Sequence, residues 1–330
     1  MNPFGAAVLS LYAAAAGNDA LLAEILAGLR ARPKYLYPKF FYDQHGSELF
    51  DRICELPEYY LTRTETSILR EHAPGFVRSL GTGVRLVEPG SGSSLKTRIL
   101  LNALMPPASY VPVDISRTHL MAAARTLAAQ YPHLEILPAA ADFTQPFELP
   151  QPMAPVRRTL VFFPGSTIGN FDHVEAVELL RMMRRLAGED GHVLVGADLR
   201  KSPAVLEAAY NDSAGVTAAF NLNLLGRLNR EYGADFDLGA FEHRAPWVEE
   251  HSRIEMHLVS RRAQRVHIRG IDIDFAAGES IWTESCHKYD CEQFAALADA
   301  AGLQVREVWL DEARRFSVQL LGVRDNNQIL

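Results

Sequence analysis

Short apolar runs alternate with amphipathic helical stretches between about residues 84 and 200 of this 330-residue chain. Strands that are almost continuously apolar are typical of a parallel sheet with helices on both faces. The pattern therefore predicts a Rossmann-like α/β domain with a mostly parallel sheet. The expected strands cover 84–90, 110–116, 134–143, 159–170 and 192–199, and the expected helices cover 94–105, 118–131 and 173–187.

The regular alternation stops after about residue 200. Residues 203–231 have helical spacing, whereas 253–262 and 264–275 alternate like antiparallel strands. A helix over 291–302 and a closing hairpin of strands over 303–310 and 315–323 then complete the sheet. We therefore expect two domains: an α/β domain from 63–199 with 289–330, and a second, α+β domain from the N-terminal 1–62 with the insertion 200–288.

The amino-acid composition limits the kinds of partner expected for this protein. Its net charge is −7, with 48% hydrophobic and 22% charged residues, which is typical of a soluble globular protein without the basic face of a nucleic-acid binder. Three cysteines form no zinc-type spacing, so we expect no metal and a reducing compartment. Residues 4–17 are apolar, but they lack a positive flank and are too short to span a bilayer, so we expect an N-terminal helix or leader there. A cytoplasmic monomer without membrane or nucleic-acid partners is the expectation.

Residues 85–98, RLVEPGSGSSLKTR, combine a strand, a glycine-rich turn and the start of a helix. Turns of this kind bind nucleotides, and three kinds of nucleotide site are candidates here. A phosphate-binding P-loop requires glycine at position 95, which holds leucine, and its side chain would enter the anion cradle. The dinucleotide fingerprint fails at the same residue.

The third candidate is S-adenosylmethionine (SAM), a nucleoside without phosphates. It needs a glycine turn, here Gly90 and Gly92, and acids at the ends of the following strands. Asp114 ends the second run, where it can accept hydrogen bonds from ribose hydroxyls, and Asp142 ends the third, where it can bind the adenine amino group beside Phe143. Glu88 lies at the mouth of the first strand, near the expected sulfonium and amino-acid tail. Three acids at one edge of the sheet favour a methyltransferase.

Longer motifs make the chain resemble the L-histidine Nα-methyltransferases of ergothioneine biosynthesis, which form the betaine hercynine. The resemblance runs from about Leu29 to Val323. It depends on FFYDQHGSELFDRICELPEYYLTRTE, LVEPGSGSSLKTR, FFPGSTIGNF, AYNDSAGVTAAFNLNLLGRLNREYGADFD, FEHRAPW, RIEMHLVSRRAQ and DFAAGESIWTESCHKY. It implies the fold of the class I SAM-dependent methyltransferases with a second, substrate-binding domain, SAM as the cofactor and a free amino acid as the substrate.

The resemblance also assigns roles to single residues. Gly90 and Lys96 match cofactor contacts of the glycine loop, Asp114 the ribose-binding acid, and Asp142 with Phe143 the adenine site. Asn170 and Tyr210 match the groups that hold the substrate carboxylate, and Glu284 matches the group that binds the imidazole. Tyr59 also matches a substrate residue, and Met256 matches a methionine that lines the substrate pocket. Apart from these matches, the aromatic faces of Tyr42, Tyr59 or Phe220 could accommodate a growing cation by cation–π attraction.

One position departs from the family pattern. The second imidazole contact, a serine in the family, falls on Cys286, and a thiol is a much poorer hydrogen-bonding group. Ser285 could replace it only if the strand slipped by one residue, which would reverse the face of the side chain. The sequence therefore predicts Nα-methylation of L-histidine, with another amino acid, such as an indole-bearing one, as the alternative.

Two functions outside this family fit the sequence less well. A non-catalytic SAM-binding module would be expected to lose the groups that hold the substrate, yet Tyr59, Asn170, Tyr210 and Glu284 are all present. A nucleic-acid methyltransferase would be expected to carry a basic face, which the net charge of −7 does not favour.

Overall fold

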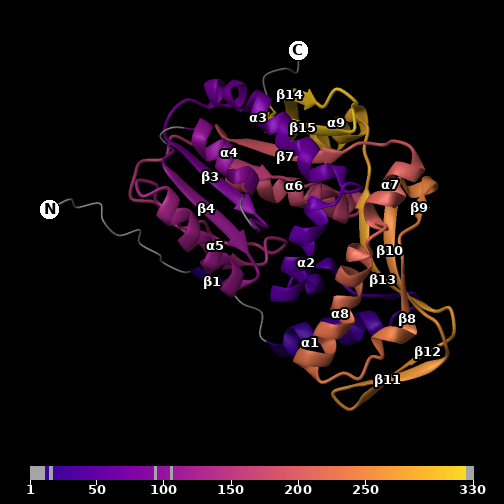
Figure 1. The fold of residues 1–330 in the computed structure, drawn as a ribbon. Helices are drawn as coiled ribbons and strands as arrows, with labels where there is room; N and C mark the ends of the chain where they lie inside the picture. Colours follow the sequence, from indigo (N-terminus) through magenta and orange to yellow (C-terminus); the bar gives the residue numbers. More distant parts are fainter. Residues whose placement is uncertain (1–11, 15–17, 93–94, 105–106, 325–330) are drawn as a thin grey trace. The chain divides into compact units, whose positions relative to one another are not determined.

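The computed structural model describes residues 12–14, 18–92, 95–104 and 107–324, and these form two compact units (Figure 1). The larger unit comprises Met1–Ala15, Leu61–Arg200 and Lys288–Leu330, and the smaller comprises Ala16–Tyr60 and Lys201–His287. Each unit has its own sheet.

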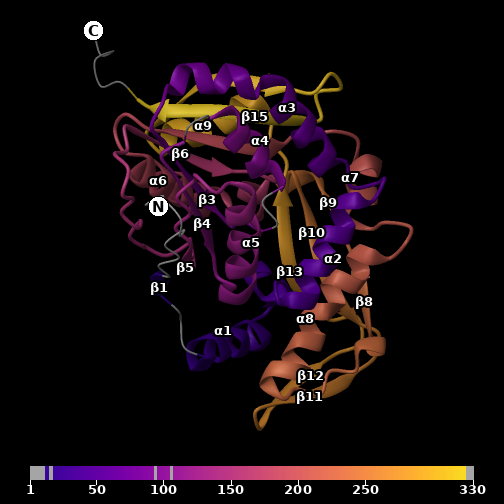
Figure 2. The same ribbon diagram turned by 60° about the vertical axis from the view of Figure 1, so that its left-hand side comes forward.

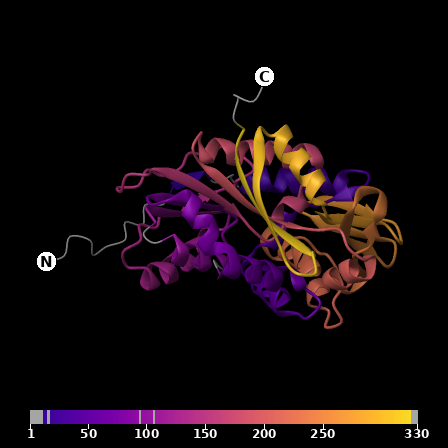
Figure 3. The same ribbon diagram turned by 90° about the horizontal axis from the view of Figure 1, so that it is seen from above.

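The sheet of the larger unit has eight strands. Their spatial order is β1 (Tyr12–Ala14), β5 (Ala139–Ala141), β4 (Ser109–Asp114), β3 (Val84–Pro89), β6 (Arg158–Phe163), β7 (His192–Asp198), β15 (Phe316–Val323) and β14 (Leu303–Leu310). The pairings from β1 to β7 are parallel, whereas β15 is antiparallel to both β7 and β14. The predicted parallel sheet and its closing hairpin, yellow in Figure 3, are both confirmed.

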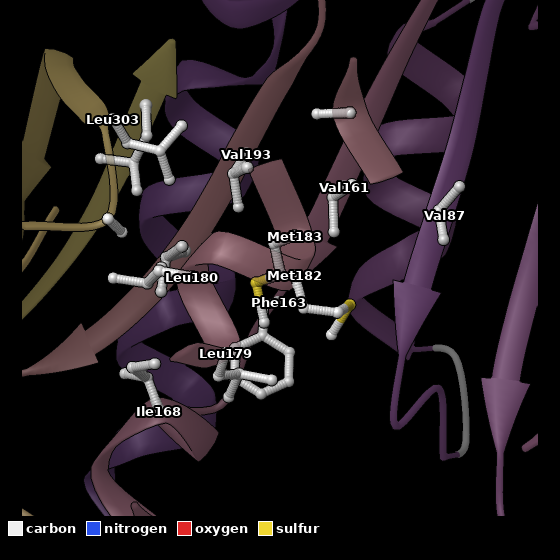
Figure 4. Packing of buried hydrophobic residues seen from close by; sticks show 14 of the residues in the cluster. Val87, Val161, Phe163, Ile168, Leu179, Leu180, Met182, Met183, Val193 and Leu303 are labelled. Atoms are coloured by element: carbon white, nitrogen blue, oxygen red, sulfur yellow. The ribbon is translucent and has the colours of Figure 1, made fainter. Parts of the chain in front are cut away.

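The central strands are buried on both faces because helices cover each side. Val193, Val195 and Ala197 of β7 join the apolar cluster of α6 (His173–Ala187) and α9 (Cys291–Ala300), part of which Figure 4 shows around Phe163. A side chain at the intervening Gly196 would instead meet α3 (Tyr60–Leu80). Since successive side chains of a strand point to opposite faces, α3 lies across the sheet from α6 and α9. The other crossover helices of this unit are α4 (Leu95–Ala103), α5 (Arg117–Gln130) and the short 3₁₀ helix η2 (Thr167–Asn170).

The smaller unit has a mixed sheet with the order β2 (Lys34–Tyr35), β13 (Ser280–His287), β10 (Arg253–Ser260) and β8 (Phe241–Arg244), and β9 (Trp247–Val248) also pairs with β10. A separate hairpin is formed by β11 (Gln264–Ile268) and β12 (Ile271–Phe275). Figure 2 shows α7 and α8 beside this sheet, and both contact β10. The helices are α1 (Asn18–Arg30), α2 (Gln44–Glu55), α7 (Pro203–Tyr210) and α8 (Val216–Tyr232), with 3₁₀ turns η1 (Pro38–Phe41), η3 (Leu238–Ala240) and η4 (Glu249–His251).

Local sequence explains where the helices of the smaller unit begin. Asp43 accepts a hydrogen bond from the Gly46 N–H at 2.7 Å and thereby caps α2. Asp212 accepts from the N–H groups of Val216 and Thr217 at 2.9 and 2.7 Å, which satisfies two donors at the start of α8. The loop between Tyr210 and α8 is therefore fixed by its own side chains.

The structure corrects several details of the predicted elements. Tyr12–Ala14 pairs in parallel with Ala139–Ala141, so this part of the N-terminal segment is a strand of the larger unit rather than part of the second domain; most of residues 4–17 lie outside the described part. The strand expected over 134–143 is interrupted at Pro138, which has no N–H to donate: Ala139–Ala141 forms β5, and Ile136 forms an isolated parallel bridge with Tyr110.

Two further details concern the insertion. The helical residues 203–231 form two helices, with a break after Tyr210. The two alternating segments are confirmed as antiparallel strands: β10 pairs with β8, β9 and β13, and 264–275 forms its own hairpin of β11 and β12.

Within the described ranges, no helix is both long enough and apolar enough to cross a bilayer.

Gly196 offers a test of the packing between α3 and the sheet. A Cβ there would lie 2.0 Å from Oε1 of Glu65, a fully buried carboxylate bound by other groups. Gly196→Ala should therefore lower the free energy of unfolding by about 2 kcal/mol, a typical cost of overpacking.

Gly75→Ala is the matched control, because Gly75 lies inside α3 and a Cβ there meets nothing within 4 Å. It should raise stability by about 0.5–1 kcal/mol through helix propensity. Chemical denaturation measures both changes, and equal effects of the two substitutions would contradict this account.

Candidate active site

The glycine turn after β3 is closely bound to the neighbouring strand. Gly90 and Gly92 have φ values of +72° and +45°, a region that favours glycine. The N–H groups of Gly90 and Ser91 donate to the Val113 carbonyl at 2.7 and 3.2 Å. A Cβ on Gly90 would lie 3.4 Å from the Phe143 ring, so the turn and the predicted adenine-site aromatic are neighbours.

The two acids predicted to bind ribose and adenine lie at the same edge of this sheet. Val113 pairs with Pro89, and Asp114 pairs with Ala140, two residues before Asp142. Asp114 accepts from the Ser116 N–H at 2.8 Å, and Asp142 accepts from Thr144 N–H and Oγ1 at 3.0 and 2.6 Å. Burial raises the pKa of Asp114, while N–H groups, those of Ser116 and Gly92 among them, oppose the shift. The carboxylate of Asp114 therefore adjoins the glycine turn.

Glu88 is more enclosed than its expected place at the strand mouth implies. Its exposed fraction is 2%, and Oε2 accepts from Thr97 Oγ1 and from the Tyr110 hydroxyl, each at 2.5 Å. Burial raises the pKa of Glu88 to about 7, although these two hydrogen bonds and the charge of Lys96 oppose the shift. Glu88 therefore changes protonation near neutral pH.

Lys96, predicted to contact the cofactor, forms an ion pair with Glu65 of α3. Glu65 is fully buried and also accepts from the Gly165 N–H at 2.8 Å, in the loop that leads to Asn170. Glu65 lies within one of the sequence motifs, but nothing in the local sequence indicates that it contacts both Lys96 and Gly165. One carboxylate thus connects the helix after the glycine turn with the loop that carries Asn170.

These residues suit a phosphate-free nucleoside. Leu95 begins α4 with an exposed fraction of 51%, at the position where a P-loop needs glycine. Acidic side chains near the turn would repel phosphates, whereas they can accept hydrogen bonds from ribose hydroxyls and an adenine amino group. The described residues also contain no cluster of three or more His, Cys, Asp or Glu side chains arranged for a metal ion.

In the smaller unit, the pairing of β10 with β13 decides which side chains share a face. Met256 pairs with Glu284, and Ile254 pairs with Cys286, so all four lie on one face. Ser285 pairs with Glu255 on the other face. Cys286, and not Ser285, therefore accompanies Glu284.

Aromatic side chains extend this face. The Tyr210 hydroxyl lies 2.7 Å from Cys286 Sγ, and both residues are buried. The Tyr210 and Tyr59 ring centroids are 6.2 Å apart in an edge-to-face arrangement. Further contacts run from Tyr59 to Phe50, and from Tyr42 to both Phe50 and Phe220, with centroid separations of 5.8–6.3 Å. The predicted substrate residues of this unit thus belong to one aromatic cluster and the adjacent sheet face.

The strand order and the site now define the class. The sheet is parallel except for β15, the last strand in the chain, which is antiparallel to both of its neighbours. Together with the glycine turn and the acids at successive strand ends, this strand order is that of a class I SAM-dependent methyltransferase. Residues 21–323 match the histidine-specific, SAM-dependent methyltransferase family, and the chain belongs to this family. The resemblance seen in the sequence is therefore confirmed, and the protein is an enzyme that uses SAM.

Similar proteins cover nearly the whole chain. It is 43% identical to a histidine N-alpha-methyltransferase of Mycolicibacterium smegmatis over 93% of this chain and 96% of the relative. A histidine N-alpha-methyltransferase of Mycobacterium tuberculosis is 42% identical over 92% and 95%. The ergothioneine biosynthesis protein 1 of Neurospora crassa is 28% identical over 84% of this chain and 32% of that longer protein.

The raised pKa of Glu88 predicts a specific pH dependence of stability. Its ordinary pKa is 4.5 and its pKa in the folded protein is about 7, so the folded state retains a proton that the unfolded state releases between these values. The contribution of Glu88 to stability should therefore fall as pH rises through this window, by roughly 3 kcal/mol in total.

Denaturant unfolding of the wild type and Glu88→Gln from pH 4.5 to 8 measures this effect. The stability of the wild type relative to the variant should decline toward pH 8. Two curves that stay parallel would contradict the assignment.

Proposed function

We propose that this enzyme methylates the α-amine of free L-histidine with SAM, in three successive transfers that yield hercynine for ergothioneine biosynthesis. Membership of the histidine-specific family and the names of the relatives support this substrate. The structural observation that carries the proposal is the shared face of Glu284 and the Tyr210–Cys286 pair in the smaller unit. These groups can bind the two ends of one small amino acid.

In this proposal the side chains act by positioning. Glu284 accepts a charge-assisted hydrogen bond from an imidazole N–H, and the Tyr210 hydroxyl donates to the substrate carboxylate. Asn170 would bind the substrate carboxylate together with Tyr210, as the resemblance implies. With both ends of the amino acid fixed, the neutral α-amine is the group left to react, and such positioning can lower a barrier by roughly 7–11 kcal/mol.

SAM supplies a methyl group that is already activated by its sulfonium, so little acid–base catalysis is required. Asp114, Asp142, Phe143 and the turn of Gly90 and Gly92 would hold the nucleoside. Each transfer leaves a bulkier amine, and the third leaves a permanent cation. The electron-rich faces of Tyr42, Tyr59 and Phe220 stabilise such a cation in the aromatic cluster.

A second candidate substrate follows from Cys286. Its thiol faces the Tyr210 hydroxyl, and it replaces the serine expected at the imidazole site. A thiol is a weak partner for an imidazole nitrogen, so a side chain with a single N–H donor, such as indole, would lose less here than imidazole. A cytoplasmic, monomeric enzyme is our expectation for either substrate.

Mass spectrometry of products tests the proposal directly. The protein is incubated with SAM and, in separate reactions, with histidine, tryptophan, phenylalanine and tyrosine. Gains of one, two and three methyl groups on histidine support the proposal. Methylation confined to another amino acid would replace histidine with that substrate.

The separate roles of the two units lead to opposite effects of two substitutions. Glu284→Ala should raise the histidine KM at least about tenfold, because a charge-assisted hydrogen bond is lost, while SAM binding stays within twofold. Asp114→Ala should weaken SAM binding by a similar factor. Calorimetric titration of each ligand separates the two effects, and an equal loss of both affinities in either variant would contradict these roles.

Cys286→Ser tests the specificity of the imidazole site. A hydroxyl forms stronger hydrogen bonds than a thiol, so the variant should bind histidine several-fold more tightly if histidine is the substrate. Cys54→Ser, outside this face, is the control and should leave the histidine affinity unchanged. An unchanged or weaker affinity in Cys286→Ser would favour the alternative substrate.

A further inference from the structure

A chain of buried and half-buried polar groups connects the backbone of Tyr210 with the strand that carries Glu284. The Asn221 Nδ2 group of α8 lies 2.9 Å from His243 Nδ1 on β8, and His243 Nε2 lies 2.9 Å from the Tyr210 carbonyl oxygen. On its other side, Asn221 Oδ1 accepts from Thr283 Oγ1 at 2.8 Å, and this hydroxyl also faces the Met256 carbonyl oxygen at 3.0 Å. Asn221 and Thr283 are almost completely buried, with exposed fractions of 0% and 1%.

The partners in this chain fix the direction of each hydrogen bond. Asn221 Nδ2 also faces the His257 carbonyl oxygen at 3.2 Å, so this end of the amide must be the NH₂ group. His243 Nδ1 therefore accepts, and its Nε2–H donates to the Tyr210 carbonyl. Burial lowers the pKa of His243, in agreement with the neutral imidazole that this pattern requires.

Both ends of the chain lie next to predicted substrate contacts. Tyr210 is the last residue of α7, and its carbonyl oxygen is the atom that His243 Nε2 contacts. Thr283 is the extra residue of a bulge between the pairs Met256–Glu284 and His257–Trp282, and it directly precedes Glu284. The bulge determines which face Glu284 occupies.

We propose that His243 is a positioning residue for the substrate, which orients the Tyr210 hydroxyl through the Tyr210 carbonyl and connects it, through Asn221 and Thr283, with Glu284. This inference rests on the proposed function, because it assumes that Tyr210 and Glu284 bind the two ends of the amino acid. Its energetic basis is the hydrogen bond between His243 Nε2 and the Tyr210 carbonyl, which is lost when His243 is removed.

Three substitutions at His243 separate its two hydrogen bonds. His243→Phe keeps a ring and removes both bonds. His243→Gln places an amide N–H near the position of Nε2 and can still donate to the Tyr210 carbonyl. His243→Asn reaches only as far as Nδ1, so it can accept from Asn221 but cannot reach Tyr210. His251→Phe, at an exposed position of the same unit, is the control for a general His-to-Phe change.

The test measures the histidine KM, kcat and the SAM dissociation constant for each variant, with thermal unfolding to establish folding. His243→Phe and His243→Asn should raise the histidine KM about tenfold and leave the SAM constant within twofold. His243→Gln should restore the KM to within about threefold of the wild type, and His251→Phe should match the wild type.

Two results would overturn the inference: a histidine KM in folded His243→Phe within twofold of the wild type, or a His243→Gln variant no better than His243→Asn. A failure of the proposed function is recognised separately, because the wild type itself would then not methylate histidine.

Discussion

The strand ends of the parallel sheet impose the constraint on which the cofactor site depends. Parallel strands that pair in register end at one edge, so the residues that follow them are neighbours although they are far apart in sequence. This pairing brings the Gly90 turn next to Asp114, and the Phe143 ring against Gly90. The acidic character of the edge then selects a nucleoside over a phosphate-bearing ligand.

In the smaller unit, a β-bulge rather than a row of aligned strand ends determines where the candidate substrate residues lie. The bulge at Thr283 shifts the register of β13 against β10, and it sets Glu284 and Cys286 on the face that Tyr210 covers. A bulge leaves polar backbone and side-chain groups to be satisfied, and here Asn221 satisfies the Thr283 hydroxyl. The geometry of this candidate substrate site therefore depends on the hydrogen bonds behind it as much as on the residues in it.

Buried polar residues also explain why part of the site could not be read from motifs. Glu65 connects Lys96 with Gly165, and His243 connects Asn221 with the Tyr210 carbonyl, yet in sequence each pair of partners is many residues apart. A carboxylate or an imidazole in an amphipathic segment has the same local signature whether it is solvated or buried. The only available hint was a polar residue such as Asn221 in the largely apolar run AFNLNLLG.

The sequence by itself determined the α/β class, the parallel strands with their closing hairpin, and the family, because strand alternation, helical spacing and long motifs are local properties. It also identified the candidate contacts, whose roles remain predictions. Tertiary structure alone decided that Tyr12–Ala14 joins the large sheet, that Glu284 pairs with Met256 beside a bulge at Thr283, and that Glu88 is enclosed by Thr97 and Tyr110. Each of these depends on pairing register or burial between distant segments, which a local pattern does not encode.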